Sequence, residues 1–286
     1  MSFDPVSFDD GLRRAKLRDC EVRYLRVGRG TRVVLLHPLR AQLDYFRPLL
    51  AHLDPAQLEV IAPDLPGHGE SSAPTARYTA EYFTDATEQL LEVCELRDAI
   101  VVGESIGGSI ALGLAARRNP RLAGVVALNP YDYGRRGGIR RSSPLADVLF
   151  TAMLWPGIGQ IVARSDTKAV LRRVLEGGLH DRSALPRDLL DEMYRCGTRR
   201  GHPRAFRSLC LNWRSWITAR EGYGAIEIPV TLVYGEDDWS RVAERDANAD
   251  AIAGARRTTI TNAGHFSCLE KPRDIAQLIG ESSAPF

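Results

Sequence analysis

Three residue types that together perform nucleophilic catalysis stand far apart in this sequence. Ser105 lies in the run Gly-Glu-Ser-Ile-Gly, His265 lies in Asn-Ala-Gly-His-Phe, and Asp237 and Asp238 form an acidic pair. A serine hydroxyl attacks a carbonyl only when a base takes its proton, and a histidine held by a carboxylate supplies that base. The sequence therefore predicts a serine nucleophile, provided that the fold brings these residues together.

The first 130 residues alternate between strands and helices. Strands are predicted at 20–28, 32–38, 58–65, 98–105 and 122–130, and helices at 43–53, 79–95 and 106–120. The run at 32–38 is apolar enough for a central strand covered on both faces, whereas 20–28 alternates like an edge or antiparallel strand. Such alternation predicts an α/β fold, a mostly parallel central sheet with helices on both faces.

The alternation stops at residue 131 and resumes near residue 225. Residues 131–224 look helical and hold 17 Lys and Arg against 9 Asp and Glu, whereas the whole chain has a net charge of only +2. Further strands are predicted at 229–238 and 255–264, and further helices at 244–254 and 270–282. We expect a core of residues 1–130 and 225–286, with residues 131–224 as an inserted helical cap. The cap is expected at the carboxyl edge of the sheet, where ligands bind in α/β folds.

Ser105 falls at the junction of a predicted strand and a predicted helix. Gly103 and Gly107 lack a Cβ, so they permit a sharp turn and close packing of the helix on the strand. The helix that follows directs its N-terminal N–H groups at the serine. This context favours a nucleophile over a small residue in an ordinary turn. A phosphate-binding loop is disfavoured because no Lys-Ser or Lys-Thr follows.

Five motifs in this order make the chain similar to the α/β-hydrolase family. They are LLHPLR, PDLPGHGESS, VGESIGG, YGEDD and NAGHF, and the resemblance extends over nearly all of residues 20–282. It implies a cap-bearing α/β-hydrolase fold, with Ser105 as the nucleophile and His265 as the general base and then the acid. The orienting carboxylate of the family usually stands three residues after a glycine, here Gly235. This spacing favours Asp238, with Asp237 as the alternative.

The same resemblance implies an oxyanion hole made by two backbone N–H groups. One belongs to Ile106, directly after the nucleophile, and the other to Leu39 in the loop after the first central strand. The chain departs from the family here, because Pro38 follows His37 where glycine is usual, and proline has no N–H to donate. The carboxylate loop DDWSRV also lacks a proline that is common in the family.

Four residues near this constellation are predicted to contact the substrate: His37, Arg40, Glu104 and Trp239. His37 can instead brace the oxyanion loop by hydrogen bonding. Arg40 can bind a substrate carboxylate through two N–H groups, and Trp239 can line the pocket. The basic cap has two interpretations, attraction of anionic substrates or an ordinary solvated surface rich in arginine.

Other properties of the sequence narrow the class of protein. The five cysteines include no Cys-x-x-Cys pair, so neither a metal site nor a disulfide framework is indicated, and no cofactor is expected. No run of about 18 apolar residues and no signal-peptide pattern occurs, so we expect a cytoplasmic protein without a membrane span. The arginines around Trp213 and Trp216 are a weak pattern for nucleic-acid binding, and no nucleic-acid partner is expected.

The predicted reaction is hydrolysis of a carboxylic ester or thioester of a small-molecule substrate through an acyl-enzyme. By resemblance, a serine at position 105 disfavours the haloalkane-dehalogenase and epoxide-hydrolase branches, whose nucleophile is an aspartate. One alternative is different chemistry on the same three residues, such as carbon–carbon bond hydrolysis or a lyase or cyclase step in a biosynthetic pathway. Another is a non-catalytic small-molecule receptor, because the fold alone does not separate these classes.

Overall fold

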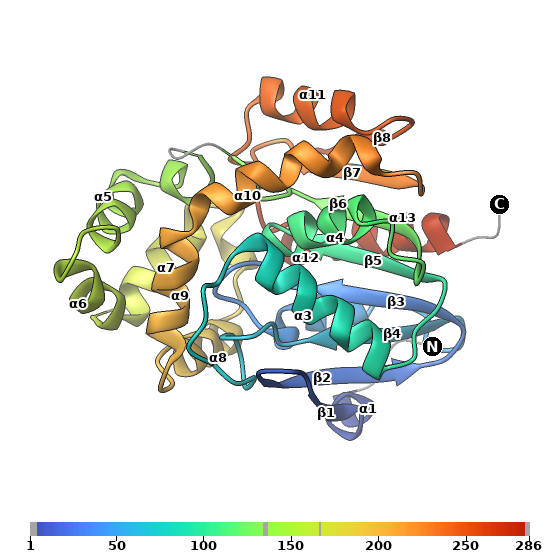
Figure 1. Ribbon diagram of the computed structural model, residues 1–286, viewed down its shortest axis with the longest axis horizontal. Helices are drawn as coiled ribbons and strands as arrows, with labels where there is room; N and C mark the ends of the chain where they lie inside the picture. Colours follow the sequence, from blue (N-terminus) through green and yellow to red (C-terminus); the bar gives the residue numbers. More distant parts are fainter. Residues whose placement is uncertain (1–4, 134–136, 166, 284–286) are drawn as a thin grey trace.

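In the computed structural model, which describes residues 5–133, 137–165 and 167–283, eight strands form one sheet (Figure 1). Their order across the sheet is β1-β2-β4-β3-β5-β6-β7-β8. β1 (Leu12–Lys16) pairs antiparallel with β2 (Glu21–Gly28), which pairs antiparallel with β4 (Leu58–Pro63). From β4 onward all neighbouring strands are parallel. The mostly parallel α/β fold predicted from the sequence is confirmed.

The remaining strands lie close to their predicted ranges. They are β3 (Thr31–Leu36), β5 (Ala99–Glu104), β6 (Leu122–Leu128), β7 (Val230–Gly235) and β8 (Arg256–Ile260). The sequence analysis did not predict β1. Only Ala15 of its five residues is buried. Its charged sequence therefore shows no apolar run, as is common for a strand at the edge of a sheet.

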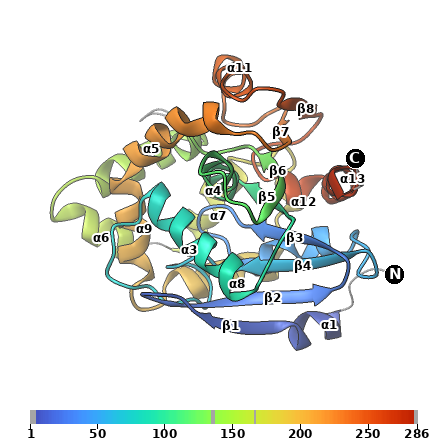
Figure 2. The same cartoon turned by 45° about the vertical axis from the view of Figure 1, so that its right-hand side comes forward.

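Helices cover both faces of the sheet (Figures 1 and 2). α3 (Ala80–Val93) and α4 (Ile106–Ala116) lie on one face, and α12 (Ser267–Glu270) and α13 (Pro272–Ser283) lie on the other. The side chains of β3 alternate between the two cores. Val34 and Leu36 are buried in the core beneath α3 and α4, and Val33 and Leu35 are buried in the opposite core. Burial on both faces explains why β3 is apolar without interruption.

The helices largely follow the predicted helical spacing. Thr79 caps α3, as predicted, because its hydroxyl accepts the N–H of Tyr82 at 3.1 Å. α4 ends at Ala116 rather than at residue 120, because Arg118 adopts a left-handed backbone with φ 53°. The other helices outside the segment between β6 and β7 are α1 (Pro5–Asp10), η1 (Leu43–Phe46), α2 (Arg47–Leu50) and α11 (Val242–Ala251). Across the described ranges, no helix is both long and apolar enough to span a membrane.

The segment between β6 and β7 is helical, and its described residues contain no strand. We call residues Gly138–Ala225 the helical insertion. Its elements are η2 (Gly138–Arg141), α5 (Pro144–Met153), α6 (Ile158–Arg164), α7 (Lys168–Glu176), η3 (Arg182–Ala184), α8 (Arg187–Gly197), α9 (His202–Leu211), α10 (Trp213–Ala219) and η4 (Arg220–Ala225). Figure 1 shows α5 to α9 beyond the carboxyl ends of the parallel strands, whereas α10 returns to pack on α3 and α4.

α4 lies unusually close to the sheet because two glycines line the contact. A Cβ added to Gly103 would lie 2.1 Å from the carbonyl oxygen of Gly107, and one added to Gly107 would lie 2.1 Å from the carbonyl oxygen of Leu36. Real Cβ atoms do not approach backbone oxygens so closely, so a side chain at either position forces α4 away from β3 and β5. These glycines set the distance between the helix and the sheet at the turn that carries Ser105.

Replacement of Gly107 by alanine tests this contact. We expect Gly107→Ala to lower the free energy of unfolding by about 3 kcal/mol, because the added methyl group overlaps backbone that cannot move alone. Gly280→Ala in α13 is the matched control, since a Cβ there meets nothing within 4 Å. It should raise stability by about 0.5–1 kcal/mol through helix propensity. Urea unfolding of both variants measures the difference, and equal stabilities would contradict the close contact.

Candidate active site

Ser105 occupies the sharp turn that joins β5 to α4. Its backbone angles, φ 60° and ψ −120°, lie outside the regions that non-glycine residues normally adopt. Such strain costs about 1–3 kcal/mol and persists only where the surroundings enforce it. Here the Ser105 N–H donates to the Leu128 carbonyl at 2.9 Å, and the Ser105 carbonyl accepts the Tyr131 N–H at 3.0 Å. These bonds fix the turn against the end of β6.

A chain of hydrogen bonds links three side chains that follow β5, β7 and β8. Ser105 Oγ lies 2.8 Å from His265 Nε2, and His265 Nδ1 lies 2.5 Å from Asp238 Oδ1. All three residues are buried, with exposed fractions of 2% for Ser105, 0% for His265 and 8% for Asp238. The structure thus brings together the three residues that the sequence predicts as nucleophile, base and orienting carboxylate.

The carboxylate of Asp238 is held by several donors besides His265. Its Oδ2 accepts the Tyr133 hydroxyl at 3.0 Å, the Ser240 N–H at 2.9 Å and the Ser240 hydroxyl. Burial alone would raise the pKa of Asp238, but His265 and these bonds outweigh it and lower the pKa to about 2. Asp238 is therefore ionised at neutral pH, as a group that orients a histidine must be.

Asp237, the alternative carboxylate, does not reach His265. Its Oδ2 lies 2.6 Å from Nδ1 of His180, and both of these side chains are exposed. The structure therefore places Asp238, and not Asp237, beside the histidine. The sequence spacing from Gly235 had favoured the same residue.

Trp239 stacks on the imidazole of His265. The two ring centroids lie 3.9 Å apart with an angle of 19° between the planes, and the indole N–H donates to the Gly177 carbonyl at 3.1 Å. The His265 N–H also donates to the insertion, to the Gly178 carbonyl at 2.6 Å. Trp239, which the sequence predicts as a substrate contact, thus holds the histidine in place and joins it to the helical insertion.

Asn129 is a site residue that the sequence prediction missed. It follows β6, has a left-handed backbone with φ 45°, and is fully buried. Its amide donates to the His265 carbonyl at 3.0 Å and to the Ser267 hydroxyl at 2.9 Å, and its Oδ1 accepts the Gly235 N–H at 2.8 Å. Asn129 therefore ties the end of β7 to the loop of His265. The available signal was an asparagine directly after a buried strand.

His37 braces the loop after β3. Its Nδ1 lies 2.8 Å from the Pro38 carbonyl, and its Nε2 accepts the Leu65 N–H at 3.0 Å. Burial lowers the pKa of His37 to about 4, so the ring is neutral and Nδ1 carries the proton that is donated to Pro38. Since backbone groups occupy both ring nitrogens, neither is left for the predicted substrate contact.

The two predicted oxyanion donors, Ile106 and Leu39, belong to the serine turn and to the loop after β3. Ile106 is the first residue of α4, so its N–H has no partner within the helix. Leu39 follows Pro38 and lines a small cavity of about 30 Å³ together with Tyr133, the residue that donates to Asp238. The cavity therefore adjoins the site from the side of the helical insertion.

Glu104 departs from the sequence prediction of a substrate contact. Its carboxyl group is fully buried, accepts the Tyr45 hydroxyl, and accepts the Cys268 N–H at 3.3 Å. Burial raises the pKa of Glu104 to about 8, although these hydrogen bonds act in the opposite direction. Successive residues of a strand point to opposite faces, so Glu104 faces the core when Ser105 faces the site. Its role is to join β5 to the helices on that face.

Arg40 lies at the boundary between the core and the helical insertion. It is 8% exposed, and its guanidinium lies 4.9 Å from the ring centre of Phe206 in α9. It lines a cavity of about 200 Å³, the apolar cavity, whose other walls are mostly apolar side chains of α5, α6 and α7 such as Phe150 and Leu171. Arg40 thus lines a cavity inside the insertion, and its contact with a substrate carboxylate stays a prediction.

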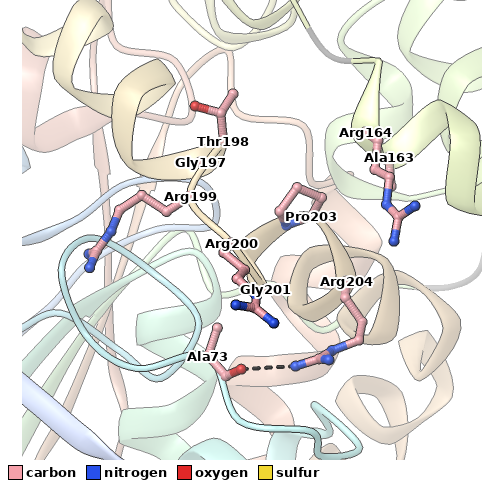
Figure 3. A pocket seen from close by; sticks show the side chains of 10 residues that line it. All are labelled: Ala73, Ala163, Arg164, Gly197, Thr198, Arg199, Arg200, Gly201, Pro203 and Arg204. Atoms are coloured by element: carbon pink, nitrogen blue, oxygen red, sulfur yellow. Dashed lines mark hydrogen bonds between the residues drawn. The ribbon is translucent and has the colours of Figure 1, made fainter.

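The insertion also carries an arginine-lined cleft on its surface (Figure 3). This basic cleft has a volume of about 650 Å³ and is lined by Arg164, Arg199, Arg200 and Arg204 among others. Arg199 donates to the Gly69 carbonyl at 2.8 Å, and Arg204 donates to the Ala73 carbonyl at 3.0 Å. The excess of positive charge in residues 131–224 is therefore gathered in part around one concave surface.

The chain belongs to the alpha/beta hydrolase fold family, because the sequence model of that family matches residues 31–272. A 2-hydroxymuconate semialdehyde hydrolase of Pseudomonas sp. (strain CF600) is 26% identical over 229 residues, which are 78% of this chain and 75% of that protein. A haloalkane dehalogenase of Mesorhizobium japonicum is 27% identical over 163 residues, 57% of this chain and 52% of that protein. The sequence relatives thus include hydrolases of more than one kind.

Solved structures share the same fold. An enol-lactonase from Burkholderia xenovorans LB400 superposes with a TM-score of 0.76 at 24% identity, covering 94% of this chain and 99% of that one. The protein Cfl2 from Burkholderia cenocepacia superposes with a TM-score of 0.83 at 19% identity, covering 96% of this chain and 95% of that one. At such identities the likeness shows the fold alone, and it confirms the predicted α/β-hydrolase fold.

Asn129→Ala tests the tie between β7 and the His265 loop. We expect a loss of about 3 kcal/mol in the free energy of unfolding, because the Gly235 N–H and the His265 carbonyl lose a buried partner. We also expect reaction of Ser105 with an active-site phosphonate to slow at least tenfold, because His265 loses its support. Asn248→Ala is the control, since Asn248 is equally buried but bonds to Asp132 and the Tyr234 hydroxyl. Equal rates in the two variants would contradict this role.

Glu104→Gln tests the buried carboxyl behind the nucleophile. Its pKa is about 8 in the folded protein against 4.5 for an ordinary glutamate. Its contribution to stability is therefore fully present below pH 4.5 and is lost as the pH rises through 8. The glutamine copies the protonated form, so the fall in the free energy of unfolding between pH 4.5 and 8.5 should shrink by about 2 kcal/mol or more. Urea unfolding across this range measures it. The exposed Glu81→Gln is the control, and parallel curves for wild type and Glu104→Gln would refute the assignment.

Proposed function

We propose that this chain is a serine hydrolase that cleaves an ester-like bond, a carboxylic ester or a thioester, of a small-molecule substrate. The observation that carries the proposal is the hydrogen-bonded chain from Ser105 through His265 to Asp238, with the serine on a strained turn. A hydroxyl in contact with a base that a carboxylate orients is the arrangement of an activated nucleophile. Membership of a hydrolase family supports the proposal.

In the first half of the proposed reaction, Ser105 Oγ bonds to the substrate carbonyl carbon while His265 Nε2 accepts the hydroxyl proton. The carbonyl oxygen takes the negative charge, and the N–H groups of Leu39 and Ile106 stabilise it. The carbon–oxygen or carbon–sulfur bond then breaks, and His265 gives its proton to the leaving alcohol or thiol. Asp238, ionised throughout, stabilises the positive charge on His265.

In the second half, a water molecule releases the acyl group. His265 accepts a proton from the water, and the water oxygen bonds to the acyl carbon. The bond between that carbon and Ser105 Oγ breaks, and the proton returns from His265 to the serine. The products are an acid and an alcohol or thiol, and no co-reactant other than water takes part.

In this proposal residues 131–224, which include all but the last residue of the helical insertion, form a cap over a core of residues 1–130 and 225–286. Its contacts support this, since Gly177 and Gly178 bond to Trp239 and to the backbone of His265. We place the protein in the cytoplasm. The five cysteines support that location, because all are buried free thiols, as is usual where thiols stay reduced.

A second candidate is hydrolysis of a carbon–carbon bond next to a carbonyl group. The observation that favours it is the similarity to a 2-hydroxymuconate semialdehyde hydrolase. The serine, histidine and aspartate take the same positions in both reactions, and the two differ in the leaving group. Turnover of simple esters and thioesters favours the first candidate. Turnover confined to substrates whose leaving group departs as a carbanion favours the second.

Labelling by a fluorophosphonate tests the proposed nucleophile without knowledge of the substrate. We expect the wild-type protein to be labelled at Ser105, and Ser105→Ala to abolish labelling. His265→Ala should slow labelling by about 10⁴-fold or more, because the hydroxyl loses its base. Asp238→Asn should slow it by about 10²–10⁴-fold, because the imidazole loses its orientation.

Asp237→Asn is the matched control for Asp238→Asn. It removes the same charge one residue away, from a side chain that contacts His180 instead of His265. We expect its labelling rate to stay within about threefold of wild type. Absence of labelling in folded wild-type protein would count against the proposal and favour a small-molecule receptor on the same fold.

A further inference from the structure

One short segment of the helical insertion exposes a cluster of large apolar side chains. Of the eight large apolar side chains that are exposed among the described residues, five lie within residues 145–161, a stretch of only 17 residues. Single exposed apolar side chains are common on protein surfaces, whereas a cluster of them marks a surface that contacts something apolar. We call residues 145–161, which extend from α5 into α6, the apolar hairpin. The five side chains are those of Leu145, Val148, Trp155, Ile158 and Ile161.

The exposed side chains follow one face of each helix and the turn between the helices. Leu145 and Val148 are three residues apart and share one face of α5. Ile158 and Ile161 have the same spacing and share one face of α6. Trp155 lies in the turn and is 55% exposed. Figures 1 and 2 both show α6 at the outer edge of the insertion, on the side opposite α13, so the apolar hairpin projects from the protein.

Contacts with the rest of the insertion hold the turn of the apolar hairpin in place. Arg207 in α9 donates to the Met153 carbonyl at 3.1 Å and to the Trp155 carbonyl at 3.3 Å. A Cβ added to Gly159 would lie 2.1 Å from the Met153 carbonyl oxygen, so α6 packs directly on the end of α5. The backbone of Trp155 is thus fixed while its side chain stays exposed. Tryptophan is the side chain that favours the boundary between water and lipid.

Positive charge lies directly beside the apolar hairpin. Arg164 ends α6 and lines the basic cleft together with Arg200 and Arg204 (Figure 3). None of these three arginines forms an ion pair with a carboxylate of a described residue, and the described lining of the cleft contains no Asp or Glu. Asp147, the one acidic residue within the hairpin sequence, accepts a hydrogen bond from Arg140 at 2.6 Å. An apolar surface and a basic surface therefore lie next to each other.

The apolar cavity of the insertion opens at the apolar hairpin. Ile161 lines this cavity and is 65% exposed, whereas the buried side chains of Phe150 and Leu171 line it from the interior. The cavity, of about 200 Å³, thus leads from the exposed face of α6 into the insertion. An apolar chain that leaves a bilayer at this face can enter the cavity without first crossing water.

An anionic bilayer matches this surface better than a second copy of the chain does. A closed dimer joins the same patch of both copies, so it would also bring the two basic clefts toward each other. Asp166, counted from the sequence, offsets only one of the three charges of Arg164, Arg200 and Arg204. A bilayer instead offers acyl chains to the apolar hairpin and phosphate groups to the arginines.

We propose that the apolar hairpin and the basic cleft form one docking surface for a lipid bilayer with anionic headgroups. Trp155, Ile158 and Ile161 enter the boundary between headgroups and acyl chains. Arg164 and Arg200 bind lipid phosphates beside them. The protein lies on the bilayer without spanning it, and the apolar cavity opens toward the lipid. The inference goes beyond the proposed function, because docking does not depend on the catalytic residues.

Sedimentation with sucrose-loaded vesicles tests the apolar part of the surface. The vesicles contain phosphatidylcholine alone or an equal mixture with phosphatidylglycerol, and the partition coefficient of the full chain should be at least tenfold higher for the mixture. Ile158→Ser/Ile161→Ser should bind the mixture at least tenfold more weakly, and Ile158→Ala/Ile161→Ala replaces it if it unfolds. Val93→Ser/Val242→Ser is the control, because it removes two exposed apolar side chains from α3 and α11 of the core. It should bind within threefold of wild type.

A second double variant tests the arginines. Arg164→Gln/Arg200→Gln should reduce the preference for the mixture to less than threefold, because the lipid phosphates lose their partners. Arg29→Gln/Arg97→Gln is the matched control, since it removes the same charge from exposed residues that precede β3 and β5, at the end of the sheet away from the insertion. Its preference should stay within twofold of wild type. Equal losses in the two variants would mean attraction to net charge alone and would overturn the proposal.

Tryptophan fluorescence locates the part of the protein that meets the lipid. Vesicles of the mixture should shift the emission of the wild type to shorter wavelength, and Trp155→Phe should lose this shift while it still binds within threefold. Failure of the folded wild type to bind the mixture would overturn the proposal, as would binding that Ile158→Ser/Ile161→Ser does not weaken. Self-association without lipid binding, abolished by the same double variant, would assign the surface to a second copy of the chain instead.

Discussion

The close contact of α4 with β3 and β5 is the constraint on which the rest of the site depends. No side chain fits between Gly107 and the carbonyl of Leu36, so the helix begins almost on the sheet. The chain must therefore turn from strand to helix within one residue, and Ser105 takes the strained backbone with φ 60°. Bonds to Leu128 and Tyr131 hold it there. Backbone packing thus determines where the side chain of residue 105 lies. That this side chain is a serine places a hydroxyl group there.

The parallel topology then brings the partners of Ser105 to it. The carboxyl ends of β5, β7 and β8 lie at one edge of the sheet, so a serine and a histidine 160 residues apart come within 2.8 Å. Topology places loops at that edge, and Asn129 sets the distance between them by bonding to Gly235 and to the His265 backbone. Trp239 then fixes the plane of the imidazole. The imidazole of His265 is thus held through its backbone and by Trp239 as well as by Asp238.

The sequence predicted what depends on local pattern. β3 shows its burial as an apolar run. The resemblance to the α/β-hydrolase family, in which the carboxylate stands three residues after a glycine, indicated Asp238 rather than Asp237. What it missed depends on contacts between distant segments. The charged β1 has no apolar run, and the roles of Glu104 and Asn129 depend on Tyr45 and on the His265 loop, which come from elsewhere in the chain. The sequence analysis predicted Glu104 as a substrate contact because it is a charged residue next to Ser105. Successive side chains of a strand point to opposite faces, so Glu104 faces the core instead.

The buried polar groups near this edge differ in how completely the chain satisfies them. Asp238 accepts hydrogen bonds from His265, Ser240 and Tyr133, and both ring nitrogens of His37 meet backbone groups. Gln42 stands five residues after His37, is as deeply buried, and has no partner for either amide atom among the residues that the structure describes. An unpaired amide is unusual in a loop where both ring nitrogens of His37 are bonded, because buried polar groups in proteins nearly always have a partner. The loop after β3 therefore carries one polar side chain that the fold satisfies and one that the described part of the chain leaves unsatisfied.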